Sequence, residues 1–202
     1  MNIIKVLDAA QEIEIFCVAQ KWKFCFIGGL AIQRWGQPRM TADADLTLLT
    51  GFGQEPPYLD TLLASFKARR ADARKFALVN RVLLLEASNQ VGIDIGIGAL
   101  PFEENSINRA SRAEIAPGYV LTTCCAEDLI VHKAFASRPQ DWLDVETILM
   151  RQNKKLNLKL VWEELTPLAE LKGDPRIMEN LIELVKEIVG ARAVPRKRRG
   201  AN

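Results

Sequence analysis

The sequence has few of the residues that build zinc-bound or disulfide-bonded scaffolds. Its 202 residues include four cysteines, none of them in a Cys-x-x-Cys spacing, and His132 is the single histidine. A structural zinc site needs cysteine and histidine ligands at better-matched spacings than these. We therefore expect small, free thiols in a protein of the reducing cytoplasm.

Long hydrophobic runs are missing as well. No apolar stretch approaches the roughly 20 residues that a membrane-spanning helix requires, and the acids within residues 1–14 do not fit a signal peptide. We therefore expect no membrane partner. By contrast, 49% of the residues are hydrophobic and 26% are charged, so the chain has enough apolar side chains to form the core of a globular protein.

Positive charge is concentrated near the C-terminal end. The formal net charge is +2, but Arg192 and the run Arg196-Lys197-Arg198-Arg199 supply five positive charges, so residues 1–191 carry −3. Such a run is typical of a disordered tail. It either contacts RNA or DNA phosphates through counterion release or is a solvated tail without a ligand. It has no interleaved aromatic side chains on which bases would stack.

The first 123 residues alternate between helical and strand-like patterns. Apolar residues recur every three or four positions over residues 3–20, which predicts an amphipathic helix. Segments 82–87 and 91–97 are short and apolar, and we expect them to pair as an antiparallel hairpin. The remaining predicted elements are helices at 30–35 and 58–69 and strands at 23–27, 44–50 and 119–123.

From residue 126 onward the pattern is helical. Pro139 suits the first turn of a helix, Asn157 suits an N-cap, and Asp174-Pro175 combines both signals. We therefore expect an α+β fold, with a mixed sheet flanked by helices and then a C-terminal helical region. The expected division is an α/β core at 1–123, a helical region at 124–190 and a basic tail at 191–202, with helices at 126–136, 139–152, 157–171 and 174–190.

Three aspartates stand out within the strand-like segments. Asp43 and Asp45 are separated by one residue, so in a strand both carboxylates point to the same face. Asp94 lies in another apolar segment, and on a neighbouring strand it could add a third carboxylate. Such a set can hold Mg²⁺, which takes oxygen ligands from few carboxylates and from substrate phosphates. The plainer alternative is an acidic strand end without a ligand.

The pair Gly28-Gly29 ends the first predicted strand and precedes a predicted helix. Glycines at such a turn let backbone N–H groups approach an anion closely, and a helix N-terminus favours negative charge. Taken alone the pair is equally compatible with a structural turn. Combined with the aspartates, it predicts a site for a metal ion and a triphosphate.

These motifs together resemble those of the nucleotidyltransferase superfamily. More narrowly, they are similar to the minimal nucleotidyltransferases and the AbiEii-like type IV toxins, over roughly residues 24–150. The resemblance implies a nucleotidyltransferase-like mixed sheet. It is carried by Ile27-Gly28-Gly29, by the segment from Pro38-Arg39-Met40-Thr41 to Asp43-Ala44-Asp45, by Ile93-Asp94-Ile95, and by a segment that contains Lys133, Arg138 and Asp141.

The resemblance implies a role for each matched residue. Gly28 and Gly29 would cradle the β- and γ-phosphates, and Asp43 and Asp45 would bind a Mg²⁺ ion that bridges the triphosphate. Asp94 would bind a second metal ion or act as general base. The other implied nucleotide-binding residues are Arg39, Thr41, Lys133 and Asp141.

Two neighbouring positions modify this picture. Asp144 shares a helix face with Asp141 and is more simply interpreted as solvated. Many nucleotidyltransferases have Gly-Ser at the turn, whereas this chain has Gly28-Gly29 and so lacks one hydroxyl.

The implied activity is transfer of an NMP from an NTP to an acceptor hydroxyl. The protein would be the toxin of a toxin–antitoxin pair, with RNA or protein as acceptor and an antitoxin protein as partner. One alternative is an adenylyltransferase for a small molecule such as an aminoglycoside. Another is a non-catalytic module that binds a nucleotide or a partner on the same fold.

Overall fold

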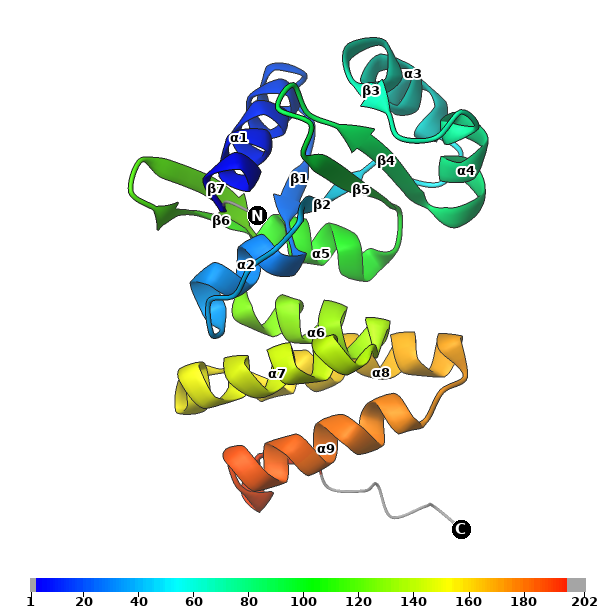
Figure 1. Cartoon of the computed structure of the whole chain (residues 1–202). Coiled ribbons are helices and arrows are strands. Elements are labelled where there is room, and N and C mark those ends of the chain that lie inside the picture. The colour runs from blue at the N-terminus through cyan, green and yellow to red at the C-terminus, as the bar shows by residue number, and fades with distance from the viewer. Residues whose placement is uncertain (1–2, 196–202) are drawn as a thin grey trace. The chain divides into compact units, whose positions relative to one another are not determined.

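The computed structural model describes residues 3–195, which form two compact units. Within that range, the first unit comprises residues 3–34 and 38–125, and the second comprises residues 35–37 and 126–195. The first unit has the mixed α+β architecture expected from the sequence, and the second is helical (Figure 1). The functional boundaries proposed at residues 123 and 190 remain predictions.

The first unit is built on a seven-stranded mixed sheet in the order β3-β4-β5-β2-β1-β7-β6. Strand β2 pairs in parallel with β5 and antiparallel with β1, and the predicted hairpin of β4 and β5 is confirmed as antiparallel. The strands are β1 Phe24–Phe26, β2 Asp43–Leu49, β3 Lys67–Ala68, β4 Val82–Glu86, β5 Gly92–Gly98, β6 Ser111–Ala116 and β7 Tyr119–Thr123.

Helices lie on both faces of this sheet (Figure 1). Helix α1 buries its apolar stripe, which includes Leu7 and Ile13, in the same core cluster as Leu46 and Leu48 of β2. Burial of such side chains is the main stabilising term in folding. Helix α5 lies beside the opposite face, where Thr47 is buried. The helices of this unit are α1 Ile3–Ala19, α2 Gly28–Trp35, α3 Glu55–Ser65, α4 Ala73–Asn80 and α5 Pro101–Arg109.

The predicted helix at 58–69 was wrong at its C-terminal end. Helix α3 stops at Ser65 because Phe66 has extended backbone angles, φ −125° and ψ 148°. The chain then pairs with β4 as strand β3, and the Arg69 N–H donates to the Leu84 carbonyl at 3.0 Å. Helices α4 and α5 and strand β6 were not predicted from the sequence.

The second unit contains the four helices that the sequence predicts. Pro139 stands in the first turn of α7, and the Asn157 side chain caps α8 by accepting from the Leu160 N–H at 3.3 Å. Gly173 ends α8 in the left-handed conformation, with φ +68°. The elements are α6 Ala126–Ala136, α7 Pro139–Gln152, the 3-10 helix η1 Asn153–Lys155, α8 Leu158–Lys172, α9 Arg176–Ile188 and the 3-10 helix η2 Ala191–Ala193.

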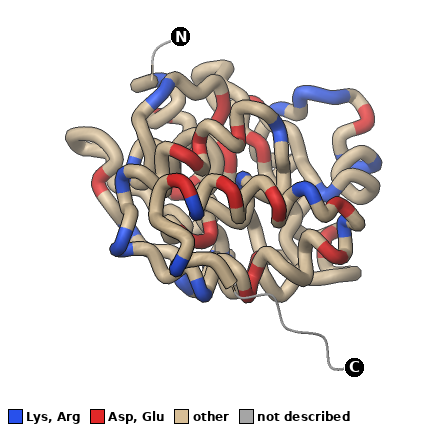
Figure 2. Tube along the Cα trace, turned by 90° about the horizontal axis from the view of Figure 1, so that it is seen from below, with Lys and Arg blue, Asp and Glu red and all other residues tan. Residues whose placement is uncertain are grey.

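The basic tail lies mostly outside the described residues. Its run Arg196-Lys197-Arg198-Arg199 falls beyond residue 195, so its predicted disorder stays a prediction. Figure 2 shows Lys and Arg interspersed with Asp and Glu along the described chain. None of the helices between residues 3 and 195 is long and apolar enough to cross a membrane. Cys17, Cys25 and Cys124 are buried, whereas Cys125 is half-buried.

Candidate active site

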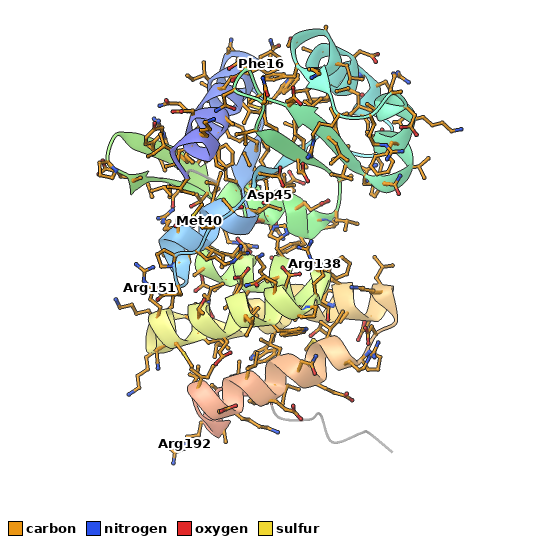
Figure 3. All side chains as sticks on the ribbon, viewed as in Figure 1. Phe16, Met40, Asp45, Arg138, Arg151 and Arg192 are labelled. Atoms are coloured by element: carbon orange, nitrogen blue, oxygen red, sulfur yellow. The ribbon has the colours of Figure 1, made fainter. Side chains whose placement is uncertain are left out.

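Strand β2 presents Asp43 and Asp45 on one face of the sheet. The intervening Ala44 is fully buried and belongs to the hydrophobic core, whereas both aspartates are half-buried. This alternation is the two-residue period of a strand, and it continues through Leu46 and Leu48 on the core side. Figure 3 labels Asp45 within this region. The sequence spacing therefore places two carboxylates side by side, opposite the packed core.

Asp94 of β5 joins the same face. In the parallel register of β2 and β5, Asp45 lies directly opposite Asp94 and Asp43 lies opposite Gly92. Burial raises the pKa of the Asp94 carboxyl, the Arg69 charge lowers it, and the nearby Asp43 charge raises it again. The structure thus brings together the three aspartates that the sequence singled out. Their catalytic and metal-binding roles remain proposals.

Arg69, which follows β3, is a further member of this group. One guanidinium nitrogen hydrogen-bonds the Asp94 carboxylate, and the other lies 3.6 Å from Asp43 Oδ1. Arg69, Asp43 and Asp94 are each about one-third exposed. We call Asp43, Asp45, Asp94 and Arg69 the acidic site. No sequence motif pointed to Arg69, because its place depends on the pairing of β3 with β4.

Gly28 brings the backbone of the turn against this acidic site. Its φ of +57° lies in the left-handed region, and a Cβ atom there would lie 2.7 Å from Asp45 Cγ. Both facts require glycine at this position. The Ile27 N–H donates to the Asp45 carbonyl at 3.0 Å, which fixes the turn to β2. Helix α2 begins at Gly28, so its N-terminal end faces the Asp45 carboxylate.

The Thr41 side chain leaves no space for a serine at Gly29, the position where many nucleotidyltransferases have one. A Cβ atom on Gly29 would lie 2.5 Å from Thr41 Cβ, so the Thr41 side chain fills the space that a larger residue would need. The Thr41 hydroxyl also donates to the Asp43 carbonyl at 3.3 Å. Thr41 and Gly29 therefore form a matched pair beside the acidic site.

Arg39 precedes this pair and is half-buried. Its Nη1 donates to the Met40 carbonyl at 3.1 Å, and Gln33 Nε2 donates to the Arg39 carbonyl at 2.6 Å. The backbone at Arg39 is thus tied to helix α2. Its predicted contact with a phosphate stays a prediction.

Lys133 and Asp141, the last two predicted nucleotide-binding residues, lie in the second unit. Lys133 Nζ forms ion pairs with Asp141 at 2.9 Å and with Asp144 at 2.8 Å. Arg138, labelled in Figure 3, adds a 2.6 Å contact from Nε to Asp141. We call these four residues the helical cluster. Lys133 thus pairs with two acids of helix α7, and the role of Lys133 and Asp141 toward a nucleotide remains a prediction.

The expectation for Asp144 was wrong. Asp144 is 2% exposed and so is not solvated, because helix α7 directs its side chain toward Lys133. Asp141 is 1% exposed. Burial raises the pKa of Asp141, but hydrogen bonds from Arg138 and Lys133 outweigh burial and hold the pKa below its ordinary value. Lys133, Asp141 and Asp144 of the helical cluster are buried, whereas the Arg138 side chain is 74% exposed, and the four residues balance in formal charge.

The donor chemistry of the acidic site suits Mg²⁺. Asp43 and Asp45 offer hard carboxylate oxygens from one strand face, the type of ligand that Mg²⁺ takes together with phosphates. Among residues 3–195, no group of three or more His, Cys, Asp or Glu side chains has an arrangement that would hold a metal ion by itself. Asp43 and Asp45 alone supply few ligands, so a Mg²⁺ ion held by them would take its remaining ligands from a bound substrate or from water.

Comparison with known proteins identifies relatives of the fold. An antigenic nucleotidyltransferase-like protein from Paracoccidioides brasiliensis is similar in structure, with a TM-score of 0.50, 13% identity and coverage of 88% of this chain and 92% of that protein. The antibiotic-resistance factor ANT(2'')-Ia gives a TM-score of 0.49 at 17% identity, over 85% of this chain and 91% of that one. The first of these likenesses shows that the chain has a nucleotidyltransferase fold.

Sequence comparison gives the family. None of the curated proteins matches this chain. The family described as "Nucleotidyl transferase AbiEii toxin, Type IV TA system" matches residues 15–197, which cover most of the first unit, all described residues of the second unit and every predicted site residue. The chain therefore belongs to the AbiEii family of nucleotidyltransferase toxins.

Proposed function

We propose that the acidic site carries out Mg²⁺-dependent transfer of an NMP from an NTP to an acceptor hydroxyl. The observation that supports this most directly is the placement of Asp43, Asp45 and Asp94 on one face of β2 and β5, next to the turn at Gly28. Carboxylates on the solvated side of a strand pair are destabilised by mutual repulsion unless a cation lies among them. Arg69 supplies one positive charge among three carboxylates, and a divalent ion that arrives with the triphosphate would supply the rest.

In this proposal the protein supplies position and charge. Asp43 and Asp45 hold the ion, and the backbone of Gly28 and Gly29 receives the phosphates at the start of α2. A bond forms between the acceptor oxygen and the α-phosphorus, while the acceptor's proton passes to a general base, Asp94 or water. The bond from the α-phosphorus to the bridging β-phosphate oxygen breaks, releasing pyrophosphate. Mg²⁺, when bound, neutralises charge on the triphosphate and orients it. In-line positioning supplies most of the remaining acceleration.

Three nucleotide contacts in the proposal rest on the sequence resemblance. Arg39 would offer a forked donor to a phosphate, and Lys133 and Asp141 would act from the second unit. An ammonium group has three N–H donors, and Lys133 directs its charge to Asp141 and Asp144. Any phosphate contact by Lys133 therefore has to share this group with two carboxylates.

The biological proposal follows the family. We propose that the protein is the toxin of a type IV toxin–antitoxin pair, with an antitoxin protein as partner and with RNA or protein as acceptor. The free thiols support a location in the reducing cytoplasm.

The test is a labelling experiment. The protein is incubated with each of the four α-³²P-labelled NTPs, Mg²⁺, and total cellular RNA and protein. We expect label in RNA or protein with the wild type, and no label with Asp45→Asn or with EDTA. Label that appears only in added aminoglycoside would assign the site to a small-molecule acceptor. Equal labelling by wild type, Asp43→Asn and Asp45→Asn would overturn the site assignment.

A further inference from the structure

Arg69 occupies a built position in the acidic site. Its backbone N–H is fixed to Leu84 of β4, and its side chain reaches across β4 to Asp94 of β5 and Asp43 of β2. Gly92, opposite Asp43 on β5, makes room for it, since a Cβ atom there would lie 2.8 Å from Arg69 Nη1 and 3.0 Å from Asp43 Cγ. Strand pairing and a glycine thus both serve to place this guanidinium between two carboxylates.

The guanidinium has the properties of a permanent cation. Arginine stays protonated at all physiological pH values, and its planar fork matches carboxylate oxygens. Enzymes that use two metal ions for phosphoryl or nucleotidyl transfer place the second divalent ion among the same acids as the first, about 3.5–4 Å away. In this site Asp94 and one side of Asp43 already face a positive charge. A second divalent ion there would compete with Arg69 for the same oxygens and would be repelled by it.

We propose that Arg69 takes the place of a second divalent metal ion, so that the site binds one divalent ion with each nucleotide. This inference rests on the function proposed above and deepens it. Asp43 and Asp45 hold the single ion, and Asp94 holds Arg69. The sequence left two roles open for Asp94, ligand of a second metal ion or general base. The pairing of Asp94 with Arg69 replaces the first of these roles. Arg69 is a positioning residue that holds two carboxylates in place through its contacts with Asp43 and Asp94.

The test counts metal ions rather than turnover. Full-length protein is dialysed to equilibrium against Mn²⁺ and a mixture of the α,β-methylene analogues of the four NTPs. The ratio of bound Mn²⁺ to bound analogue is then measured. We expect a ratio of one for the wild type and of two for Arg69→Gln, which leaves Asp94 open to a second ion. Arg69→Lys, which keeps the charge, should retain a ratio of one.

Arg70→Gln is the matched control. Arg70 is the next residue and pairs with the exposed Asp72, with 2.9 Å between Nε and Oδ1, away from the three aspartates of the site. This variant should retain a ratio of one. In EDTA, Arg69→Gln should melt at a lower temperature than Arg70→Gln. Addition of Mn²⁺ should raise the melting temperature of Arg69→Gln by more than that of Arg70→Gln.

Two results would overturn the inference and leave the proposed function intact. One is a ratio of two in the wild type, which decides the question even if no variant folds. The other is a ratio of one in an Arg69→Gln protein with wild-type circular dichroism. If the wild type, like the Asp45→Asn variant, bound neither Mn²⁺ nor any analogue, the inference and the proposed function would be overturned together.

Discussion

The acidic site and the helical cluster are both groups of ion pairs, yet they differ in burial and in charge balance. The acidic site has three carboxylates and one guanidinium, that of Arg69, which contacts Asp43 and Asp94, and the side chains of these two aspartates are 37% and 31% exposed. In the helical cluster two carboxylates face two cations, and the side chains of Lys133 and Asp141 are 7% and 1% exposed. The first is short of positive charge and open to solvent, whereas the second is neutral overall and mostly closed.

Burial favours a structural role for the helical cluster, and exposure suits the binding role proposed for the acidic site. A buried charge that loses its partner is strongly destabilising, because no solvent replaces the lost interaction. A half-exposed carboxylate that lacks a partner is stabilised by water, so it remains available to bind a cation from solution. Substitution of the same residue types is therefore predicted to impair folding in the helical cluster and ligand binding in the acidic site.

The largest expected effect is on the stability of the helical unit. Lys133→Met would leave the buried Asp144 without its ammonium partner, and we expect the free energy of unfolding to fall by about 3–5 kcal/mol. Urea unfolding followed by circular dichroism measures this. The matched control is Lys159→Met, since Lys159 forms an exposed pair with Glu163 at 3.6 Å and should be nearly neutral. Equal effects of the two substitutions would erase the distinction between the clusters.

The next largest effect is on nucleotidyl transfer. Asp43→Asn should lower labelling of the acceptor by at least about 100-fold, as expected when a group that organises transition-state charge is removed. Its melting temperature should stay close to that of the wild type, because Asp43 is half-exposed. Asp144→Asn should show the reverse pattern, with a clearly lowered melting temperature. The comparison between the two clusters would be contradicted if Asp43→Asn lowered stability enough to unfold the protein, yet the refolded variant labelled the acceptor normally.

A smaller effect concerns the turn beside the acidic site. Gly29→Ser would push its side chain against Thr41, and overpacking of this kind lowers stability by about 1–3 kcal/mol. The double variant Gly29→Ser with Thr41→Ala removes the opposing side chain and should recover most of that loss. Thermal unfolding of the four proteins forms a double-mutant cycle. Additive effects of the two substitutions would show that these residues do not press on one another.

The smallest effect is a pH dependence of the helical unit. Burial lowers the pKa of His132 to about 4, the charge of Asp128 raises it, and that of Lys133 lowers it. In an unfolded chain the pKa of histidine is about 6.5. Between these values the unfolded state binds more protons than the folded state, so stability falls as pH falls. From pH 7 to pH 5 the expected loss is at most about 2 kcal/mol.

His132→Gln isolates this contribution. The substitution removes the titrating group, so the melting temperature of the variant should change less between pH 7 and pH 5 than that of the wild type. Parallel pH profiles of the two proteins would rule out a buried, neutral His132 as the cause.

Much of the fold was predictable because its signals are local. The apolar spacing over residues 3–20 predicted α1, and the cap at Asn157 predicted the start of α8. Helix α9 begins at Arg176 with Pro175 as its N-cap, two residues after the predicted start at Asp174. The aspartate spacing in β2 also gave the correct face for two carboxylates. Helices α4 and α5 were missed, since α4 is short and α5 follows Pro101 in a segment with little apolar periodicity.

The sequence by itself determined the spacings along the chain: two carboxylates on one strand face, a glycine turn at the end of the preceding strand, and a run of capped helices. Bond geometry and backbone periodicity fix these features within a few residues. Only the tertiary structure decided which distant residues meet. Strand pairing brought Arg69 and Gly92 to the aspartates, the turn set Thr41 against Gly29, and helix packing buried Asp144 beside Lys133. Such contacts depend on the whole packed core, which no local pattern encodes.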